Sequence, residues 1–204
     1  MALRIIIVLI LVNCTFSINA QFRIHAGGGA NFSNISFKNI KTPELNSATN
    51  YFLSVRPEIG LNSLLAVGVD IQFSQKGYHY QDVQNVPVEG YRFQYLDLLP
   101  QAQFRFVKPL ALYGGLGIGI RTSEKTNIGD VWEETKNKLS RPAEFTYVAG
   151  LRIFPFKKIS LHAQFAGSLS SFLDIEFADV NGAPIPNVKT RLNNIQIGVG
   201  YQFY

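Results

Sequence analysis

Two histidines are the side chains of this sequence best suited to acid–base or metal chemistry. His25 and His162 both fall on the polar face of a predicted strand, and imidazole titrates near neutral pH and binds metals. Neither has a second histidine at ligand spacing, and no Ser-His-acid order typical of a hydrolase is evident. The sequence therefore predicts no catalytic residue, no cofactor and no metal site. Ser160 beside His162 leaves a lipid-modifying enzyme as one alternative.

Charged side chains on the same polar faces form the second candidate group. Charges removed from water need an opposite charge or a water molecule beside them. We therefore predict a network of charges in the interior of the protein, which either forms salt bridges and plugs the interior or lines a narrow polar path. The predicted network comprises Arg23, Arg56, Glu58, Asp70, Asp97, Arg105, Glu144 and Arg152, with Arg121 on the same face.

Eight segments with alternating apolar and polar residues position these side chains. In residues 195–203, for example, isoleucine, valine, tyrosine and phenylalanine alternate with glutamine and glycine. A period of two residues predicts β-strands with one apolar face. The predicted strands are 22–32, 51–61, 64–75, 91–106, 110–121, 142–154, 158–172 and 190–204.

The connections between these strands alternate in length. Tight turns are expected at 62–63, 107–109 and 155–157, whereas 33–50, 76–90, 122–141 and 173–189 are long. Short turns on one rim and long loops on the other are typical of outer-membrane barrels. The sequence therefore predicts an all-β fold: an eight-stranded antiparallel up-and-down transmembrane β-barrel with short periplasmic turns and long extracellular loops.

The apolar faces could point outward to lipid or, in a soluble lipocalin-like barrel, inward. Small and polar residues suit a narrow lumen, and aromatic residues gather at both strand ends like interfacial girdles, so we predict that the apolar faces contact lipid. The expected girdles are Phe22, Phe104, Phe106, Phe154, Tyr201 and Phe203 near the short turns, and Phe32, Tyr51, Phe73, Tyr91, Phe93 and Phe172 near the long loops.

Strand 91–106 changes parity within this pattern. Tyr91, Phe93 and Tyr95 occupy odd positions, whereas the apolar residues from Leu98 onward occupy even ones. A β-bulge near Tyr95 would reconcile the two halves. Bulges are also expected at the two prolines inside strands, Pro57 and Pro100, because proline cannot donate to a ladder.

The N-terminus predicts a secretory address. Arg4 precedes an apolar run of eight residues, 5–12, which suits a signal peptide cleaved after Ala20. We therefore expect residues 1–20 to be a signal peptide and 21–204 an outer-membrane β-barrel domain. The single cysteine, Cys14, lies within the leader, where a weak lipoprotein-like sequence offers an alternative. The net charge of +5 includes no basic run, so we expect no nucleic-acid partner.

Several motifs resemble the small outer-membrane barrel proteins of the PorT-like "porin family" of Bacteroidetes-type bacteria. The glycine-rich segment 27–33, the element 95–100, and segments 112–117 and 145–151 are similar to successive strands of that family. Tyr201, Phe203 and Tyr204 resemble its aromatic C-terminal insertion signal. The resemblance implies a Gram-negative outer-membrane location, contact with outer-membrane lipid, and recognition by the barrel-insertion machinery during biogenesis.

The family's roles vary, so the resemblance implies little about activity. We expect no enzyme but a structural or interaction protein, acting through surface loops in adhesion, envelope integrity or association with a secretion complex. A protein partner would bind at these extracellular loops, with the lumen plugged. The alternative function is a narrow passive channel for small solutes or ions. Trp132, in the predicted loop 122–141, would either anchor a partner or pack onto the base of its own loop.

Overall fold

A computed structural model describes residues 21–39, 45–80, 89–129, 131–173, 184–185 and 188–203. The predicted signal peptide with its cleavage site, most of the predicted loop 173–189, and Tyr204 of the predicted insertion signal lie outside the described residues. None of the described residues belongs to a helix that is long and apolar enough to cross a membrane.

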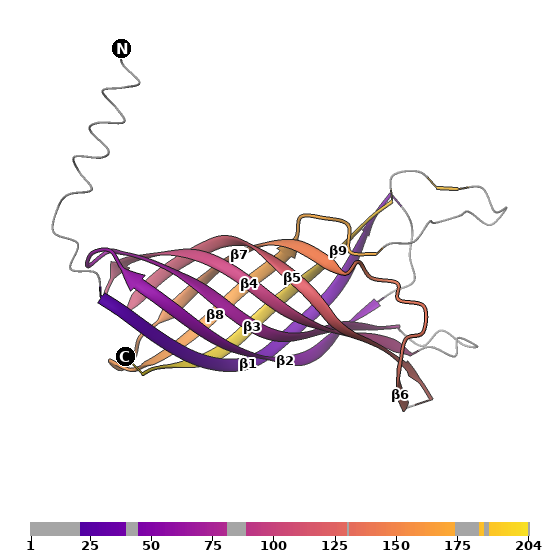
Figure 1. Cartoon of the computed structure of the whole chain (residues 1–204), viewed down its shortest axis with the longest axis horizontal. Coiled ribbons are helices and arrows are strands. Elements are labelled where there is room, and N and C mark those ends of the chain that lie inside the picture. The colour runs from indigo at the N-terminus through magenta and orange to yellow at the C-terminus, as the bar shows by residue number, and fades with distance from the viewer. Residues whose placement is uncertain are drawn as a thin grey trace, which may run out of the picture.

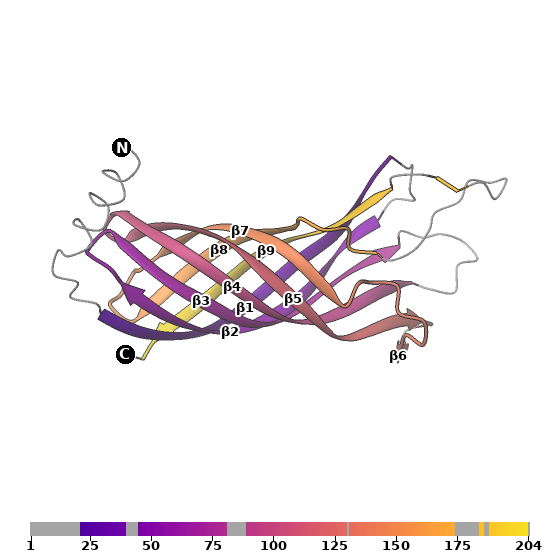
Figure 2. The same cartoon turned by 45° about the horizontal axis from the view of Figure 1, so that its top comes forward.

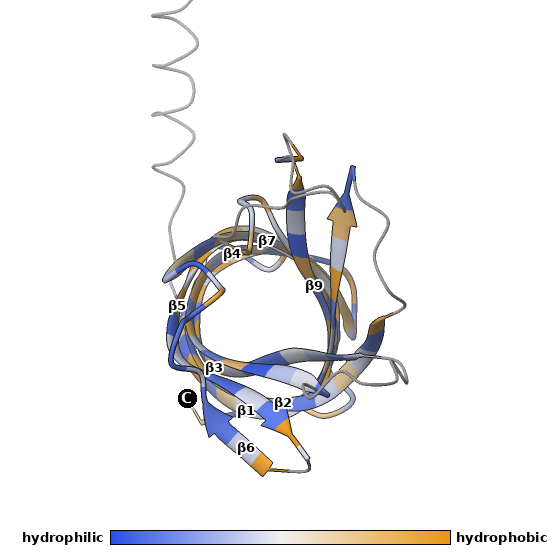
Figure 3. Cartoon of the chain, turned by 90° about the vertical axis from the view of Figure 1, so that its right-hand side faces the viewer, coloured by the Kyte–Doolittle hydropathy of each residue, from blue (hydrophilic) through white to orange (hydrophobic). Residues whose placement is uncertain are grey.

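The chain forms a closed antiparallel barrel of eight strands, as predicted (Figures 1 and 3). Neighbouring strands follow the chain order, and the pairing of β4 with β5 and of β1 with β9 closes the ring. A short ninth strand, β6, pairs with β5 beyond the ring. The strands are β1 (Gln21–Lys38), β2 (Leu45–Gly60), β3 (Leu65–Tyr80), β4 (Gly90–Val107), β5 (Leu110–Ile128), β6 (Val131–Glu134), β7 (Ala143–Ile153), β8 (Ile159–Ser168) and β9 (Lys189–Gln202).

Several strands are longer than predicted at the long-loop end, where they run past the body of the barrel (Figure 2). Parts of 33–50, 76–90 and 122–141, which were predicted as loops, belong to β1, β2, β3 and β5. In β3 the outward apolar residues end at Phe73, and alternation then places Gln75, Gly77 and His79 outward. The ladder continues because backbone hydrogen bonds do not require apolar side chains. These extensions therefore lie beyond the apolar band.

The outward face of the barrel is apolar and exposed, and the inward face is polar and buried. Large outward residues such as Leu116, Phe145 and Ile197 are more than half exposed, whereas glutamine, serine and charged side chains fill the interior. A soluble barrel would have the opposite polarity, because its apolar residues would form the core. The exposed girdle members include Phe22, Phe32, Tyr51, Phe104, Phe106, Tyr201 and Phe203.

The prediction for the aromatic residues of β4 was wrong. Phe93 and Tyr95 are fully buried and belong to an interior cluster together with Phe172, which was also expected on the outside. β4 has no extra residue near Tyr95, since its register with β3 is unbroken through the pair Ser74↔Tyr95. The irregularity lies instead between β4 and β5, where Thr122 has no ladder partner.

Neither proline of the strands requires a bulge. Pro57 and Pro100 lie where the ladder toward one neighbour is interrupted for two residues, and the register is the same on both sides of each gap. A proline lacks only its N–H, so the loss of a few ladder bonds accommodates it. The barrel therefore closes without a bulge at either proline.

The lipid-facing assignment makes a quantitative prediction for two equally exposed residues. Ile197→Lys, in the middle of the outward band (55% exposed), is expected to destabilise the protein in lipid vesicles by about 2–4 kcal/mol. Val131→Lys, on β6 (56% exposed), is expected to change the free energy of unfolding by no more than about 0.5 kcal/mol. Urea unfolding measures both, and similar losses in the two variants would contradict a lipid-facing band.

Candidate functional site

A buried carboxylate organises the short-turn end of the lumen. Glu58 is 2% exposed, and its carboxylate lies 3.1 Å from Arg105, 3.4 Å from Arg23 and 3.5 Å from Arg56. His25 Nε2 lies 3.9 Å from the same group. Three guanidinium groups therefore surround one carboxylate, which leaves an excess of positive charge at this end.

A second part of the predicted network lies against aromatic and amide groups. Arg152 is buried, donates a hydrogen bond to the Gln103 side chain, and places its guanidinium 4.3 Å from the centre of the Tyr113 ring. Charge–aromatic contact of this kind stabilises a desolvated cation. Gly150 allows the approach, because a β-carbon there would lie 2.4 Å from Tyr113 Cζ.

The space left between these groups is very small. A cavity of about 10 Å³ is lined by His25, Ser54, Arg56, Asp70, Arg152, Ser160 and His162, among others. This volume holds about one water molecule. The His162 ring packs edge-on against Phe52, with ring centres 5.6 Å apart. No lipid or other organic substrate fits beside His162 in this interior.

Lys76, on β3, connects the neighbouring strand β4 to β7 inside the barrel. Its Nζ lies 3.2 Å from Asp97 Oδ1 on β4 and 3.5 Å from Glu144 Oε2 on β7, and it stands 4.6 Å from the centre of the Tyr95 ring. Ser168 donates a hydrogen bond to Glu144. All three charged groups are buried, so the single ammonium group compensates one of the two carboxylate charges in the middle of the lumen.

Glutamine side chains make a second connection across the lumen. Gln72 and Gln196 exchange hydrogen bonds of 3.2 and 2.9 Å between β3 and β9. Gln164 on β8 donates to the same Gln196 oxygen at 2.8 Å. Paired amides satisfy donors and acceptors together, so this layer is filled by protein groups.

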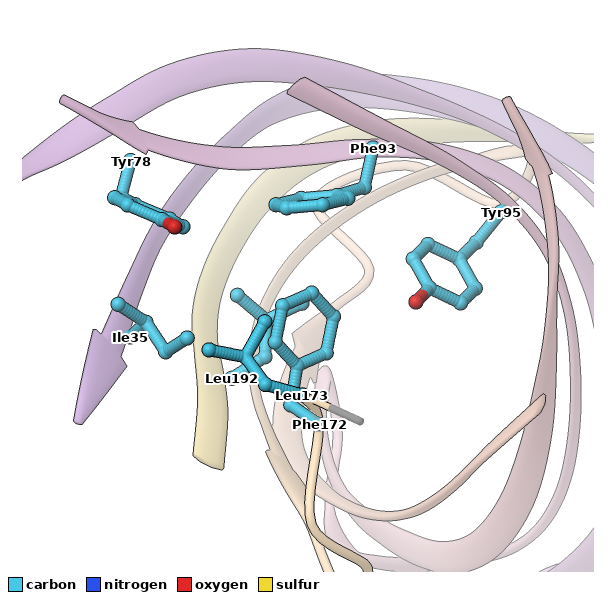
Figure 4. Packing of buried hydrophobic residues seen from close by; sticks show 7 residues of the cluster. All are labelled: Ile35, Tyr78, Phe93, Tyr95, Phe172, Leu173 and Leu192. Carbon is cyan, nitrogen blue, oxygen red and sulfur yellow. The ribbon is translucent and has the colours of Figure 1, made fainter. Parts of the chain in front are cut away.

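An aromatic and aliphatic cluster packs inside the long-loop end of the barrel (Figure 4). The Phe93 and Phe172 rings meet edge to face with centres 4.9 Å apart. The Phe172 and Leu173 backbones donate hydrogen bonds to Thr190, at 2.9 and 2.8 Å, which hold this segment inward. The cluster consists of Ile35, Tyr78, Phe93, Tyr95, Phe172, Leu173 and Leu192.

Tyr78 forms the outer edge of this cluster beyond the apolar band. Its ring lies 5.7 Å from Tyr80 and 5.4 Å from Tyr91 between ring centres. Burial, followed by the influence of Tyr80, raises the pKa of the Tyr78 phenol far above its usual range. The apolar surroundings of this phenol therefore disfavour its ionised form.

The hairpin of β5 and β6 projects outside the barrel at the long-loop end. Gly129 adopts a φ of 55°, which glycine tolerates without strain, and β6 returns along β5. The Arg92 guanidinium lies 4.0 Å from the Trp132 ring centre, and the His79 ring packs edge-on at 6.2 Å. Trp132 thus packs onto β3 and β4, which differs from the expected packing onto the base of its own loop.

A buried glutamate fixes the chain that follows this hairpin. Glu124 is fully buried and accepts hydrogen bonds from the backbone N–H of Leu139 and Ser140, at 2.9 and 3.2 Å. Arg121 forms a salt bridge of 2.9 Å with the same carboxylate. The segment 135–141 is therefore tied to the barrel rim by side-chain contacts, although it contains little regular structure.

All eight predicted network residues face the lumen, in three groups. Arg23, Arg56 and Arg105 surround Glu58, while Asp97 and Glu144 meet through a shared lysine. Asp70 and Arg152 line the small cavity.

Sequence reasoning missed Lys76 and Glu124, since both fell in predicted loops. The alternation Gln72, Ser74, Lys76, Tyr78 could have revealed the lysine. The described residues contain no group of three or more His, Cys, Asp or Glu side chains arranged to hold a metal ion.

Comparison with known proteins identifies the architecture. Residues 6–203 match a family model described as "Outer membrane protein beta-barrel domain". None of the curated proteins matches the chain significantly.

Solved structures share the fold at low sequence identity. Ail, the attachment invasion locus protein of Yersinia pestis, is 19% identical with a TM-score of 0.54, covering 90% of this chain and 99% of its own. Neisserial surface protein A is 14% identical with a TM-score of 0.52, covering 91% and 99%. OprG from Pseudomonas aeruginosa is 14% identical with a TM-score of 0.50, covering 91% and 97%. Likeness at this level concerns the fold alone.

The ion triad predicts a strong and reversible effect on stability. Lys76→Met leaves two buried carboxylates without a counter-charge, so we expect a loss of about 3–5 kcal/mol in the free energy of unfolding. The triple variant Lys76→Met, Asp97→Asn, Glu144→Gln removes all three charges and is expected to recover most of that loss. Urea titration in vesicles compares them, and a loss below about 1 kcal/mol for the single variant would contradict the triad.

Proposed function

The chain belongs to the outer membrane protein beta-barrel domain family, and from this premise we propose that it is a closed, non-catalytic barrel that acts through its long-loop end. The barrel anchors in outer-membrane lipid by its apolar outer face. Its role is that of a structural or interaction protein, in adhesion, envelope integrity or association with a secretion complex. The motif resemblance supports a PorT-like member of the family, exported by its signal peptide and inserted by the barrel-insertion machinery.

The contacts between side chains across the lumen are the observation that supports this proposal. Side chains meet across the barrel at successive levels: the guanidinium groups around Glu58, the paired amides of Gln72 and Gln196, the Lys76 triad and the aromatic cluster. The cavity of about 10 Å³ within them leaves room for about one water molecule. This filling argues against the channel alternative, and the position of His162 inside it argues against lipid turnover.

The long-loop end supplies the surface for a partner. The ends of β3 and β4 offer no free edge here, because Tyr78 pairs with Tyr91 and β4 also pairs with β5. Within the described part of the chain, β6 is the strand that has a ladder partner on one side only. A strand edge of this kind accepts an added strand from another protein. Val131, 56% exposed, gives the edge an apolar contact.

Electrical measurement tests the closed lumen directly. In planar bilayers, the wild-type protein is expected to give no stable conductance steps above the bare membrane. The triple variant Phe52→Ala, Gln72→Ala, Gln196→Ala removes side chains from two cross-lumen contacts and serves as the comparison for a partly emptied barrel. Stable wild-type steps well above the baseline would overturn the closed lumen and favour the channel.

Photo-crosslinking in intact cells tests the β6 surface. A photoreactive residue at Val131 is expected to yield a discrete protein adduct, whereas the same residue at Phe145, which faces lipid, is expected to yield none. The N–H of Thr135 points to β5, so alternation points the N–H of Glu134 to the free edge. Glu134→Pro removes that donor and should abolish the adduct, while Glu134→Ala should retain it. An absent adduct at Val131, or one that survives Glu134→Pro, contradicts strand addition.

A further inference from the structure

The short-turn rim has a marked imbalance of charge. The segments 21–25, 59–65, 105–110, 153–159 and 200–203 contain no aspartate or glutamate. They contribute five cationic side chains, Arg23, Arg105, Lys108, Lys157 and Lys158. The carboxylate at this end is Glu58, which is buried and already contacts three arginines. The rim therefore presents positive charge that the neighbouring residues do not neutralise.

Two of these lysines border a pocket. A hollow of about 640 Å³ lies between the turns at 107–109 and 154–157 and extends to the turn at Ser63. Lys108 and Lys157 are exposed, and neither forms a salt bridge with any residue that the structure describes. The volume lies within the usual range for a small-molecule site.

The rest of this pocket is apolar and aromatic. Phe106, Phe154 and Phe156 line it together with Pro109 and Leu110. The Arg105 guanidinium stands 4.9 Å from the centre of the Phe154 ring, so this arginine is held between the ring and the Glu58 carboxylate. Cationic groups beside an apolar wall match a ligand that joins an anionic head to a hydrocarbon body.

The pocket lies at the height where such a ligand is found. Phe104, Phe106 and Tyr201 are exposed on the outer face just below the short turns, where aromatic side chains mark the membrane interface. Phe156 is 68% exposed at the turn itself. Lipid headgroups therefore surround the rim, and cationic side chains at a membrane surface attract anionic ones.

We propose that this pocket binds the headgroup of an anionic phospholipid from the leaflet on the short-turn side. Lys108 and Lys157 contact the phosphate, and Phe106 and Phe156 pack against the glycerol and the first carbons of the acyl chains. The site is distinct from the long-loop surface and rests on the membrane location of the family rather than on the role proposed for β6. Its failure would leave that role intact, and the reverse also holds.

Fluorescence quenching tests the site because the chain has a single tryptophan, Trp132, at the opposite end. In a Trp132→Phe background, Phe156→Trp places the reporter in the pocket. Quenching by brominated phosphatidylglycerol and brominated phosphatidylcholine gives their relative binding constants. Each lysine is expected to raise the binding constant for an anionic headgroup roughly fivefold. The two lysines together therefore give an expected preference of about 25-fold for the anionic lipid.

Lysine variants test whether the lipid preference comes from this pocket or from a general attraction between the protein and anionic lipid. Lys108→Gln with Lys157→Gln is expected to bring the preference close to one, with folding checked by heat-modifiability on a gel. The matched control, Lys38→Gln with Lys189→Gln, removes two exposed lysines that face each other across β1 and β9 at the other end. That control should retain the full preference.

The outcomes that would overturn the proposal are equally distinct. A wild-type preference below about twofold, or one unchanged in the Lys108→Gln, Lys157→Gln variant, would show that the pocket selects no anionic lipid. Inorganic phosphate at 20 mM, compared with sodium chloride of equal ionic strength, should leave the preference in place. Its loss in phosphate alone would assign the pocket to free phosphate and overturn the lipid assignment.

Discussion

The hydrocarbon interior of a membrane offers no partner to a backbone N–H or C=O, so every strand that crosses it needs a neighbour on both sides. This chain meets the requirement by closing eight strands through the β4–β5 and β1–β9 ladders. Closure at this strand number makes the ring narrow. The contents of the lumen follow from that width, because side chains from opposite walls must either interlock or clash. Gly198 illustrates the fit, since a β-carbon there would lie 2.6 Å from Phe52 Cζ.

The interior is graded from one end to the other. Guanidinium groups dominate at the short turns, amides and a lysine-centred triad follow, and an apolar cluster lies at the long-loop end. Buried charge is tolerated because each ion contacts an opposite charge, an aromatic face or a hydrogen-bond donor. The two rims consequently differ in character. One is cationic and borders lipid headgroups, and the other is an apolar cluster that carries a projecting hairpin.

Alternation in the sequence was enough to predict the fold and the inward position of the eight network charges. It succeeds where one face of a strand meets lipid and the other meets the polar lumen. Because successive side chains point to opposite faces, apolar and polar residues must then alternate. It failed beyond the apolar band, where the outward face of β3 is no longer apolar, and there β3 was ended five residues early, so Lys76 was missed. Tyr91, Phe93 and Tyr95 were placed outside because alternation does not distinguish an aromatic residue that meets lipid from one that packs inside the barrel.

The aromatic cluster also constrains the order in which the molecule is assembled. It joins Ile35 of β1 to Leu192 of β9, residues that are separated by nearly the whole length of the chain, and adds Phe93 from the middle. Contacts between such distant residues form late, because the entropy of closing a long loop opposes them until other strands have paired. The cluster is therefore complete only when the first and last strands have met, so its packing follows ring closure in time and takes place inside a barrel that already exists.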